Sequence, residues 1–147
     1  MSCRIRASTI CINDGRYLVV QLRDPHSGAR YLLPPGGEVE TGETPEQAAV
    51  RETLEETGYQ VQALQGSECI VQYSFLWSGV QHECQTHFFL AHLKDAKSAS
   101  NSMTPTRPLS LEKYHEGHAW ITRTALEEEL EFHPKLRKAI LDMVDSH

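Results

Sequence analysis

Residues 44–58 carry a consistent set of helix signals, and this segment constrains the fold of the chain more than any other. Thr44 is a good N-cap residue, Pro45 suits the first helical position, and Gln47 stands at the capping-box distance from Thr44. Gly58 stands at the far end, where helices commonly finish with a left-handed residue. The sequence therefore predicts one well-bounded helix between Thr44 and Gly58.

Three glutamates of this helix, Glu52, Glu55 and Glu56, project to one side. At roughly 100° per residue their side chains fall within an arc of about 100°. Like charges at this spacing weaken an isolated helix by about 0.2–0.5 kcal/mol per pair. A divalent cation would reverse this penalty, because hard ions such as Mg²⁺ take carboxylate and phosphate oxygens as ligands. A solvated acidic surface is the alternative for such a cluster.

The side of the helix opposite the glutamates is predicted to face a core. Val50, Leu54 and Thr57 gather there, as expected for an amphipathic helix. On the acidic side, Arg51 precedes Glu55 by four residues, so the two side chains are expected to form a hydrogen bond.

A glycine turn leads into this helix. Residues 32–37 read LPPGG after an initial leucine, and glycine lets a backbone approach a ligand closely. Together the turn and the helix give the pattern G-x5-E-x7-R-E-x-x-E-E-x-G. Its fixed positions are filled by Gly37, Glu43, Arg51, Glu52, Glu55, Glu56 and Gly58.

The stretch from Gly37 to Tyr59 resembles a complete Nudix box, the motif of the Nudix hydrolase family. Thr53 stands at a usually aliphatic position and Tyr59 at the last apolar position, and both are mild departures that concern packing. The resemblance implies a single domain over residues 1–147. Its implied fold is α+β, an α/β/α sandwich with a mixed central sheet.

The resemblance also implies the activity and the metal. It points to an enzyme that depends on Mg²⁺ or Mn²⁺ and cleaves the diphosphate linkage of a nucleoside diphosphate derivative, such as a nucleoside triphosphate, a nucleotide sugar or a dinucleotide. Glu52, Glu55 and Glu56 would be catalytic metal ligands, together with the carbonyl of Gly36. Clustered metals suit this chemistry, because they neutralise phosphate charge and activate water.

Two alternatives remain open at this stage. Glu43 and Arg51 would brace the loop and the helix. The alternative for Arg51 is a direct contact with a substrate phosphate. The chain as a whole would alternatively be a catalytically silent nucleotide-binding or regulatory module on the same fold. Retention of every box glutamate favours the enzyme.

Further candidate substrate-binding residues lie outside the box. Tyr73, Phe75 and Trp77 alternate along one predicted strand and share a face, where Tyr73 or Trp77 would stack on a base or simply cover a core. Arg23 and Arg30 flank a loop before the glycine turn and are phosphate-contact candidates.

An additional acid from a distant loop is a further candidate for the metal site. Glu112 and Glu116 precede the last predicted strand, and solvent-exposed surface charge is the alternative for both.

The rest of the chain is expected to supply a sheet and two terminal helices. Asn13-Asp14-Gly15 and Ser78-Gly79 are predicted hairpin turns, and residues 94–110 are rich in turn formers. The predicted strands are residues 4–12, 16–23, 31–33, 59–64, 68–77, 80–93 and 117–122, and the terminal helices are residues 124–130 and 134–146.

Composition limits the possible partners and location. A net charge of −6 argues against general nucleic-acid binding, which usually requires a basic patch, but it permits a small nucleotide held through a metal. The four cysteines show no paired C-x-x-C spacing, no apolar stretch is long enough to span a membrane, and no signal peptide is visible. We therefore expect a cytoplasmic protein with no membrane partner, and a homodimer is a possibility that the family resemblance raises.

Overall fold

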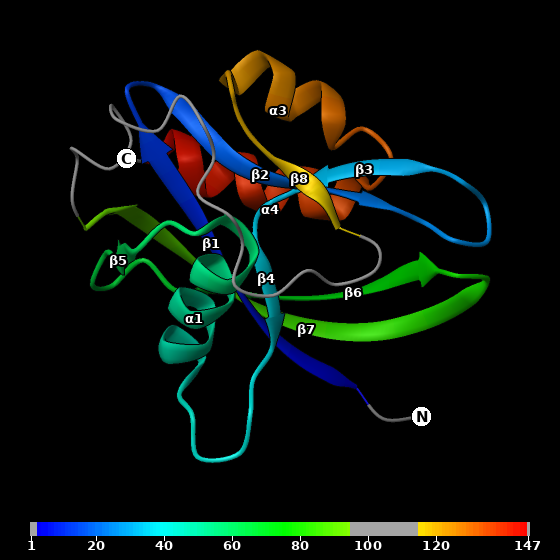
Figure 1. The fold of residues 1–147 in the computed structure, drawn as a ribbon, viewed down its shortest axis with the longest axis horizontal. Helices are drawn as coiled ribbons and strands as arrows, with labels where there is room; N and C mark the ends of the chain where they lie inside the picture. Colours follow the sequence, from blue (N-terminus) through cyan, green and yellow to red (C-terminus); the bar gives the residue numbers. More distant parts are fainter. Residues whose placement is uncertain (1–2, 95–114, 147) are drawn as a thin grey trace.

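The computed structural model describes residues 3–94 and 115–146, and within them the chain forms eight strands and three helices (Figure 1). The strands are β1 (Arg4–Asn13), β2 (Arg16–Arg23), β3 (Arg30–Leu33), β4 (Gly36–Glu38), β5 (Val61–Ala63), β6 (Cys69–Trp77), β7 (Val80–Leu93) and β8 (His115–Ile121). The helices are α1 (Pro45–Thr57), α3 (Arg123–Glu129) and α4 (Pro134–Asp145). Most of the predicted loop at residues 94–110 lies outside the described residues.

The strands form one mixed sheet with the order β3-β2-β1-β7-β5, and β4, β6 and β8 pair with β1, β7 and β2 off this path. The β1–β7 pair is parallel, and the other pairs are antiparallel. β1 is the hub of the sheet, because it pairs with β2 at its end, with β7 over most of its length, and with β4 at residues 6–8. The α+β sandwich with a mixed sheet is thus confirmed.

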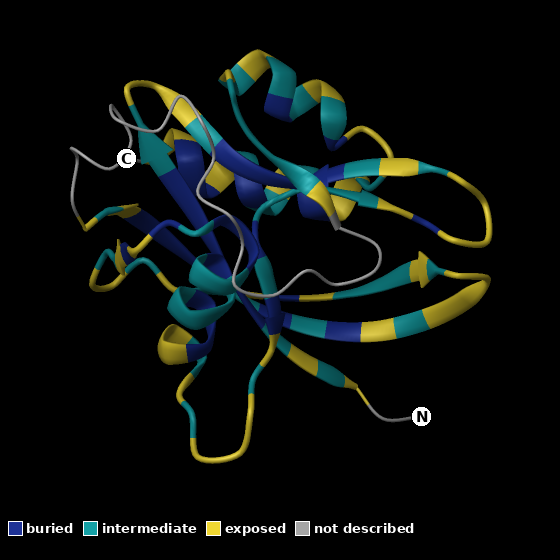
Figure 2. Ribbon diagram, viewed as in Figure 1, coloured by how far each residue is buried: buried dark blue, intermediate teal, exposed yellow. Residues whose placement is uncertain are grey.

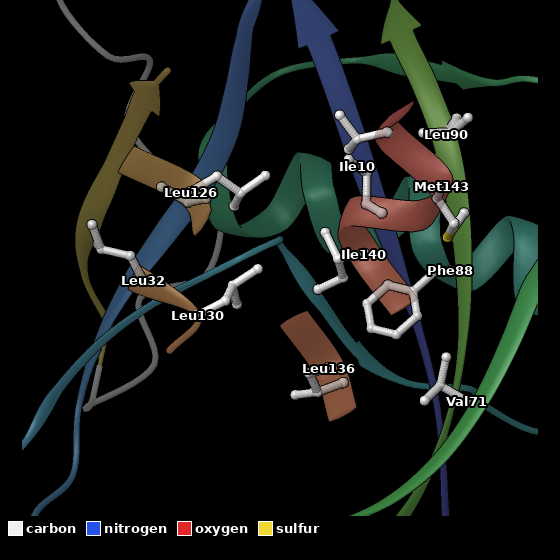
Figure 3. Packing of buried hydrophobic residues seen from close by; sticks show 12 residues of the cluster. Ile10, Leu32, Val71, Phe88, Leu90, Leu126, Leu130, Leu136, Ile140 and Met143 are labelled. Carbon is white, nitrogen blue, oxygen red and sulfur yellow. The ribbon is translucent and has the colours of Figure 1, made fainter. Parts of the chain in front are cut away.

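Alternating side chains divide the core into two layers. On β1, Ile10 faces the layer of α3 and α4, whereas Ala7 and Cys11 face the layer of α1. On β7, Phe88 and Leu90 belong to the first layer, and Phe89 and Ala91 to the second. Figure 3 shows the first layer, where side chains of α4 meet those of β1 and β7; the α4 residues are Leu136, Ile140 and Met143.

Helix α1 begins and ends as predicted. Thr44 and Gln47 form a reciprocal capping box, and Gly58 adopts the left-handed conformation with φ 81°. The predicted core-facing side is confirmed for Thr57, which is buried, and for Val50, which is half-buried and packs against the core cluster that contains Tyr59, whereas Leu54 is only half-buried. Most of the buried side chains of α1 are small, so the helix lies close to β1 and β4 and leaves little room for larger apolar groups. The buried residues of the helix are Ala48, Ala49, Thr53, Glu56 and Thr57.

A pair of buried hydroxyls joins α1 to β1. Thr53 Oγ1 lies 2.7 Å from Thr9 Oγ1 and 2.8 Å from the carbonyl oxygen of Ala49, and both threonines are fully buried. Because Thr53 donates its one hydroxyl hydrogen to Ala49, Thr9 is the donor to Thr53. The threonine at the aliphatic box position therefore has a specific partner in the sheet.

This pair predicts a non-additive effect on stability. Thr53→Val leaves the Thr9 hydroxyl without an acceptor and should lower the free energy of unfolding by about 1–3 kcal/mol. Changing both residues to valine removes the unsatisfied donor as well, so the double variant should be more stable than the sum of the single effects. Urea denaturation of the four proteins measures this coupling. Additive losses would show that the two hydroxyls do not depend on each other.

Asp24 joins two chain segments that are distant in sequence. Its carboxylate accepts hydrogen bonds from the backbone N–H groups of His26 (2.8 Å) and Ser27 (3.3 Å) in the β2–β3 loop, and of Ser78 (3.0 Å) in the β6–β7 turn. Asp24 is 3 % exposed, while the residues around it are mostly exposed, as the yellow hairpin ends in Figure 2 show. The bonds hold these two hairpin ends side by side.

None of the helices in the described part of the chain is long and apolar enough to cross a membrane.

Candidate active site

A cavity of about 520 Å³ brings together side chains from both ends of the Nudix-like stretch and from the sheet. Its apolar surface comes from β2, β3, β6, β7 and α4. Its charged lining consists of Arg4, Arg6, Glu38, Glu40, Glu52 and Glu56. The cavity therefore combines an acidic region on β4 and α1 with an apolar region beneath it.

Arg51 is held by several acceptors next to this cavity. Its Nε and Nη2 donate to the two carboxylate oxygens of Glu43 at 2.7 and 3.1 Å, and Nη1 donates to Glu52 at 2.9 Å and to Glu55 at 3.1 Å. Nη2 also donates to the carbonyl of Glu38 at 3.1 Å. All of its nitrogens are therefore engaged by protein groups, and Arg51 does not line the cavity. These contacts suit bracing of the loop and helix rather than phosphate binding.

The Glu43–Arg51 pair gives a prediction for the pH dependence of stability. The Arg51 guanidinium holds the pKa of Glu43 below its ordinary value, so the pair stabilises the fold above that ordinary value. The contribution is lost as the pH falls through the lowered pKa. Glu43→Gln should therefore melt below the parent at pH 7, and the gap in melting temperature should shrink as the pH falls below 4. A gap that stays constant over this range would contradict the ion pair.

Glu56 ties α1 to the glycine turn. Its Oε1 accepts a hydrogen bond of 2.8 Å from the N–H of Gly36, and the residue is 7 % exposed. Gly36 is itself packed on β1, because a side chain there would meet the carbonyl of Ala7 at 2.5 Å. The carboxylate of Glu56 thus reaches the cavity next to the backbone of β4.

Gly37 makes room for the carboxylate of Glu52. A Cβ atom at position 37 would lie 2.4 Å from Cδ and Oε2 of Glu52, so only glycine allows this approach. Burial, and then the nearby charge of Glu56, raise the pKa of Glu52 to about 6. Burial and the repulsion from Glu56 thus outweigh the hydrogen bond from Arg51 to Glu52, and a bound cation would relieve that repulsion.

The donor set fits a divalent cation, although the side chains do not yet converge on one point. Within residues 3–94 and 115–146, no three histidine, cysteine, aspartate or glutamate side chains are close enough to hold an ion as they stand. Glu52 and Glu56 line the cavity, but Glu55 bonds Arg51 and does not line it. A cation beside Gly36 and Gly37 would relieve the repulsion between Glu52 and Glu56, and Glu55 would join them only by leaving Arg51.

The aromatic candidates do line the cavity. Tyr73, Phe75 and Trp77 all face it from β6. The hydroxyl of Tyr73 lies 2.7 Å from Thr86 Oγ1, and its ring also contacts the core. The rings of Phe75 and Trp77 are stacked with their centroids 6.4 Å apart. Both rings also contact the ring of Tyr31, so an aromatic cluster forms one wall of the cavity.

The remaining candidates lie elsewhere or are not described. Arg23 forms an exposed ion pair of 2.9 Å with Glu116, and neither residue lines the cavity. Arg30 is exposed on β3, paired in register with Arg23, and is likewise absent from the lining. Glu112 lies outside the described residues.

Several charged or polar cavity residues were not among the predicted site residues, including Arg4, Arg6, Glu38 and His82. Arg4 forms an ion pair of 2.6 Å with Glu38, and Arg6 lies two residues further along β1 on the same face. The alternation of β1 indicates that Arg4 and Arg6 share a face with Ile10. Nothing in the sequence indicates that this face borders the acidic helix.

Comparisons with known proteins agree with this fold. A family model described as the NUDIX domain matches residues 4–143. No curated protein matches the chain with significance. The solved structures that resemble it include a NUDIX hydrolase from Nitrosomonas europaea, with a TM-score of 0.72, 20 % identity, and coverage of 99 % of this chain and 90 % of the other.

Two further solved structures are similar over nearly the whole chain. An Ap4A hydrolase from C. elegans has a TM-score of 0.66 and 18 % identity, and the match covers 98 % of this chain and 99 % of that one. A MutT NUDIX hydrolase from Burkholderia pseudomallei has a TM-score of 0.60 and 24 % identity, with coverage of 95 % and 99 %.

The sandwich and the braced acidic helix define a protein of the Nudix hydrolase class. Because the NUDIX domain model spans residues 4–143, the chain belongs to the Nudix family.

Proposed function

We propose that this chain is a pyrophosphohydrolase that uses Mg²⁺ or Mn²⁺ to cleave the diphosphate linkage of a nucleoside diphosphate derivative. One observation carries this proposal: the carboxylates of Glu52 and Glu56 enter a single cavity beside the backbone of Gly36 and Gly37. Two carboxylates that lie close together beside a backbone carbonyl suit a cation and the phosphate oxygens that accompany it.

Each residue of the site has a distinct role in this proposal. When bound, a divalent cation neutralises phosphate charge and lowers the pKa of the attacking water. Glu52, Glu56 and the carbonyl of Gly36 would hold it, joined by Glu55. Arg51 keeps the rotamer of Glu52 defined through its hydrogen bond, whereas Glu55 would reach the cation only after leaving Arg51.

The shape of the cavity supports a nucleotide as the substrate. Phe75 and Trp77 offer stacked apolar rings on the same cavity as the glutamates, and stacking of a base on an aromatic ring contributes about 1–3 kcal/mol. Tyr73 adds to this surface from the same face of β6. The names of two solved relatives, Ap4A hydrolase and MutT NUDIX hydrolase, agree with this substrate class.

A substrate panel tests the proposal. Nucleoside triphosphates, nucleotide sugars and dinucleoside polyphosphates are incubated with the protein and Mg²⁺ or Mn²⁺, and the products are identified. We expect cleavage of at least one of these classes at a P–O–P bond, and no cleavage after chelation of the metal. Absence of turnover across the panel, with metal binding intact, would support a silent nucleotide-binding module instead.

A further inference from the structure

The carboxylates around the cavity are already engaged by protein groups. Glu38 is paired with Arg4, Glu52 bonds Arg51, and Glu56 accepts from the N–H of Gly36. The guanidinium groups of Arg4 and Arg51 are therefore already paired with carboxylates of the protein. A substrate diphosphate that enters this cavity needs positive charge beyond the metal, because charge on its outer oxygens must also be neutralised.

Arg6 is the cavity cation that remains uncommitted. Its guanidinium forms no ion pair with a carboxylate in the described part of the chain. Its nearest polar contact is the carbonyl of Gly36, at 3.5 Å from Nη2, which is the outer limit of a hydrogen bond. The residue is half-buried and lines the cavity between Arg4 and Ser8 of the same strand face.

The surroundings of Arg6 place its charge between the acidic and the aromatic regions. In the sheet, Arg6 pairs in register with Glu38 of β4 on one side and with Thr86 of β7 on the other, and Thr86 Oγ1 lies 2.7 Å from the hydroxyl of Tyr73. A diphosphate extending from the glutamates toward the β6 aromatic residues would pass this guanidinium. Arginine suits that contact, because its planar fork binds two phosphate oxygens at once.

We propose that Arg6 is the side chain that binds the substrate's diphosphate in this site, a role for which the sequence had suggested Arg23, Arg30 or Arg51. The inference rests on the proposed function and adds a residue to it. The proposal also explains why the Arg6 guanidinium lies beside the carbonyl of Gly36. A bound metal ion would repel the guanidinium there unless a phosphate lay between the two positive charges. On substrate binding, the guanidinium exchanges its long contact with Gly36 for phosphate oxygens.

Equilibrium binding of ADP in the presence of Mg²⁺ tests this assignment without requiring turnover. We expect Arg6→Gln to weaken ADP binding roughly 10- to 100-fold, as for loss of a hydrogen-bonded charge pair. Arg6→Lys should recover part of the affinity, since it restores the charge but not the fork. Arg16→Gln removes the same charge from an exposed position outside the cavity and should bind ADP like the parent.

Kinetics on the best panel substrate separate binding from a merely structural role. A phosphate contact made equally in substrate and transition state raises KM with little change in kcat. If Arg6 only supported Gly36, Arg6→Gln would instead raise the Mg²⁺ concentration needed for half-maximal activity and leave KM unchanged, which would overturn the assignment. Unchanged ADP affinity in Arg6→Gln would overturn it as well.

The outcomes also separate this inference from the proposed function. If the parent turns over substrate and Arg6→Gln has parental ADP affinity and KM, the role of Arg6 is refuted and the pyrophosphohydrolase function stands. A parent that binds ADP through Arg6 but cleaves nothing on the panel would keep the diphosphate contact and remove the catalytic function.

Discussion

Glu56→Gln is expected to lower kcat/KM on the best panel substrate by roughly 100-fold or more, which corresponds to about 2.7 kcal/mol of transition-state stabilisation. Glutamine keeps the shape of the side chain and retains an oxygen that accepts the hydrogen bond from the N–H of Gly36. The change therefore removes the negative charge of the proposed metal ligand and keeps the shape of the side chain. The melting temperature should stay close to that of the parent.

The control for this variant is Glu46→Gln, which removes an exposed carboxylate from the first turn of the same helix. Steady-state rates and thermal melts of the three proteins are compared at saturating Mg²⁺. A Glu56→Gln protein with a near-parental rate would show that Glu56 is not a ligand of a catalytic metal.

Gly37→Ala is expected to produce a loss of similar size without touching any charged group. The new methyl group would lie 2.4 Å from the carboxylate of Glu52, so the carboxylate or the β4 backbone must move. Displacement of a catalytic group by about 1 Å lowers rates by roughly 100-fold. Gly37 does not have a positive φ, so alanine brings no backbone strain of its own.

A double variant identifies the cause of this loss. If Gly37 acts by making room for Glu52, adding Gly37→Ala to Glu52→Gln should lower kcat little further, since the affected group is already inactive. Multiplying losses in kcat would mean that Gly37 acts independently of Glu52, for instance through the β4 pairing with β1.

The acidic helix was predictable because its information is local. Caps, proline and glycine at the ends of α1 each act within a few residues, so Thr44, Gln47 and Gly58 adopt the expected geometry. The hairpins at Asp14-Gly15 and Ser78-Gly79 were predictable for the same reason, and all four residues adopt positive φ.

Features that depend on distant neighbours were not predictable. Strand β4 was read as a turn, because Gly36 and Gly37 are weak strand formers, and it exists through its pairing with residues 6–8 of β1. The buried face of α1 was predicted only in part: Thr57 is buried and Val50 packs on the core, but the burial of Ala48, Ala49 and Glu56 follows from the close approach of the helix to the sheet.

The substrate side of the site shows the same limit. Arg6 carries no motif, and its place in the cavity follows from the position of β1 between β4 and β7. In the sequence, Arg23 was a candidate for phosphate binding and Glu116 a candidate for the metal site. The pairing of β2 with β8 instead brings the two side chains together as an exposed ion pair. Pairing between strands far apart in sequence decides both cases.

The carboxylate of Asp24 has a consequence for substrate size. By accepting hydrogen bonds from both the β2–β3 loop and the β6–β7 turn, it holds these two segments together near the aromatic end of the cavity. Hydrogen bonds between the two segments restrict their separation, so a substrate must fit a preformed space. We therefore expect bulky leaving groups to be discriminated by steric exclusion, with little adjustment of the protein around them.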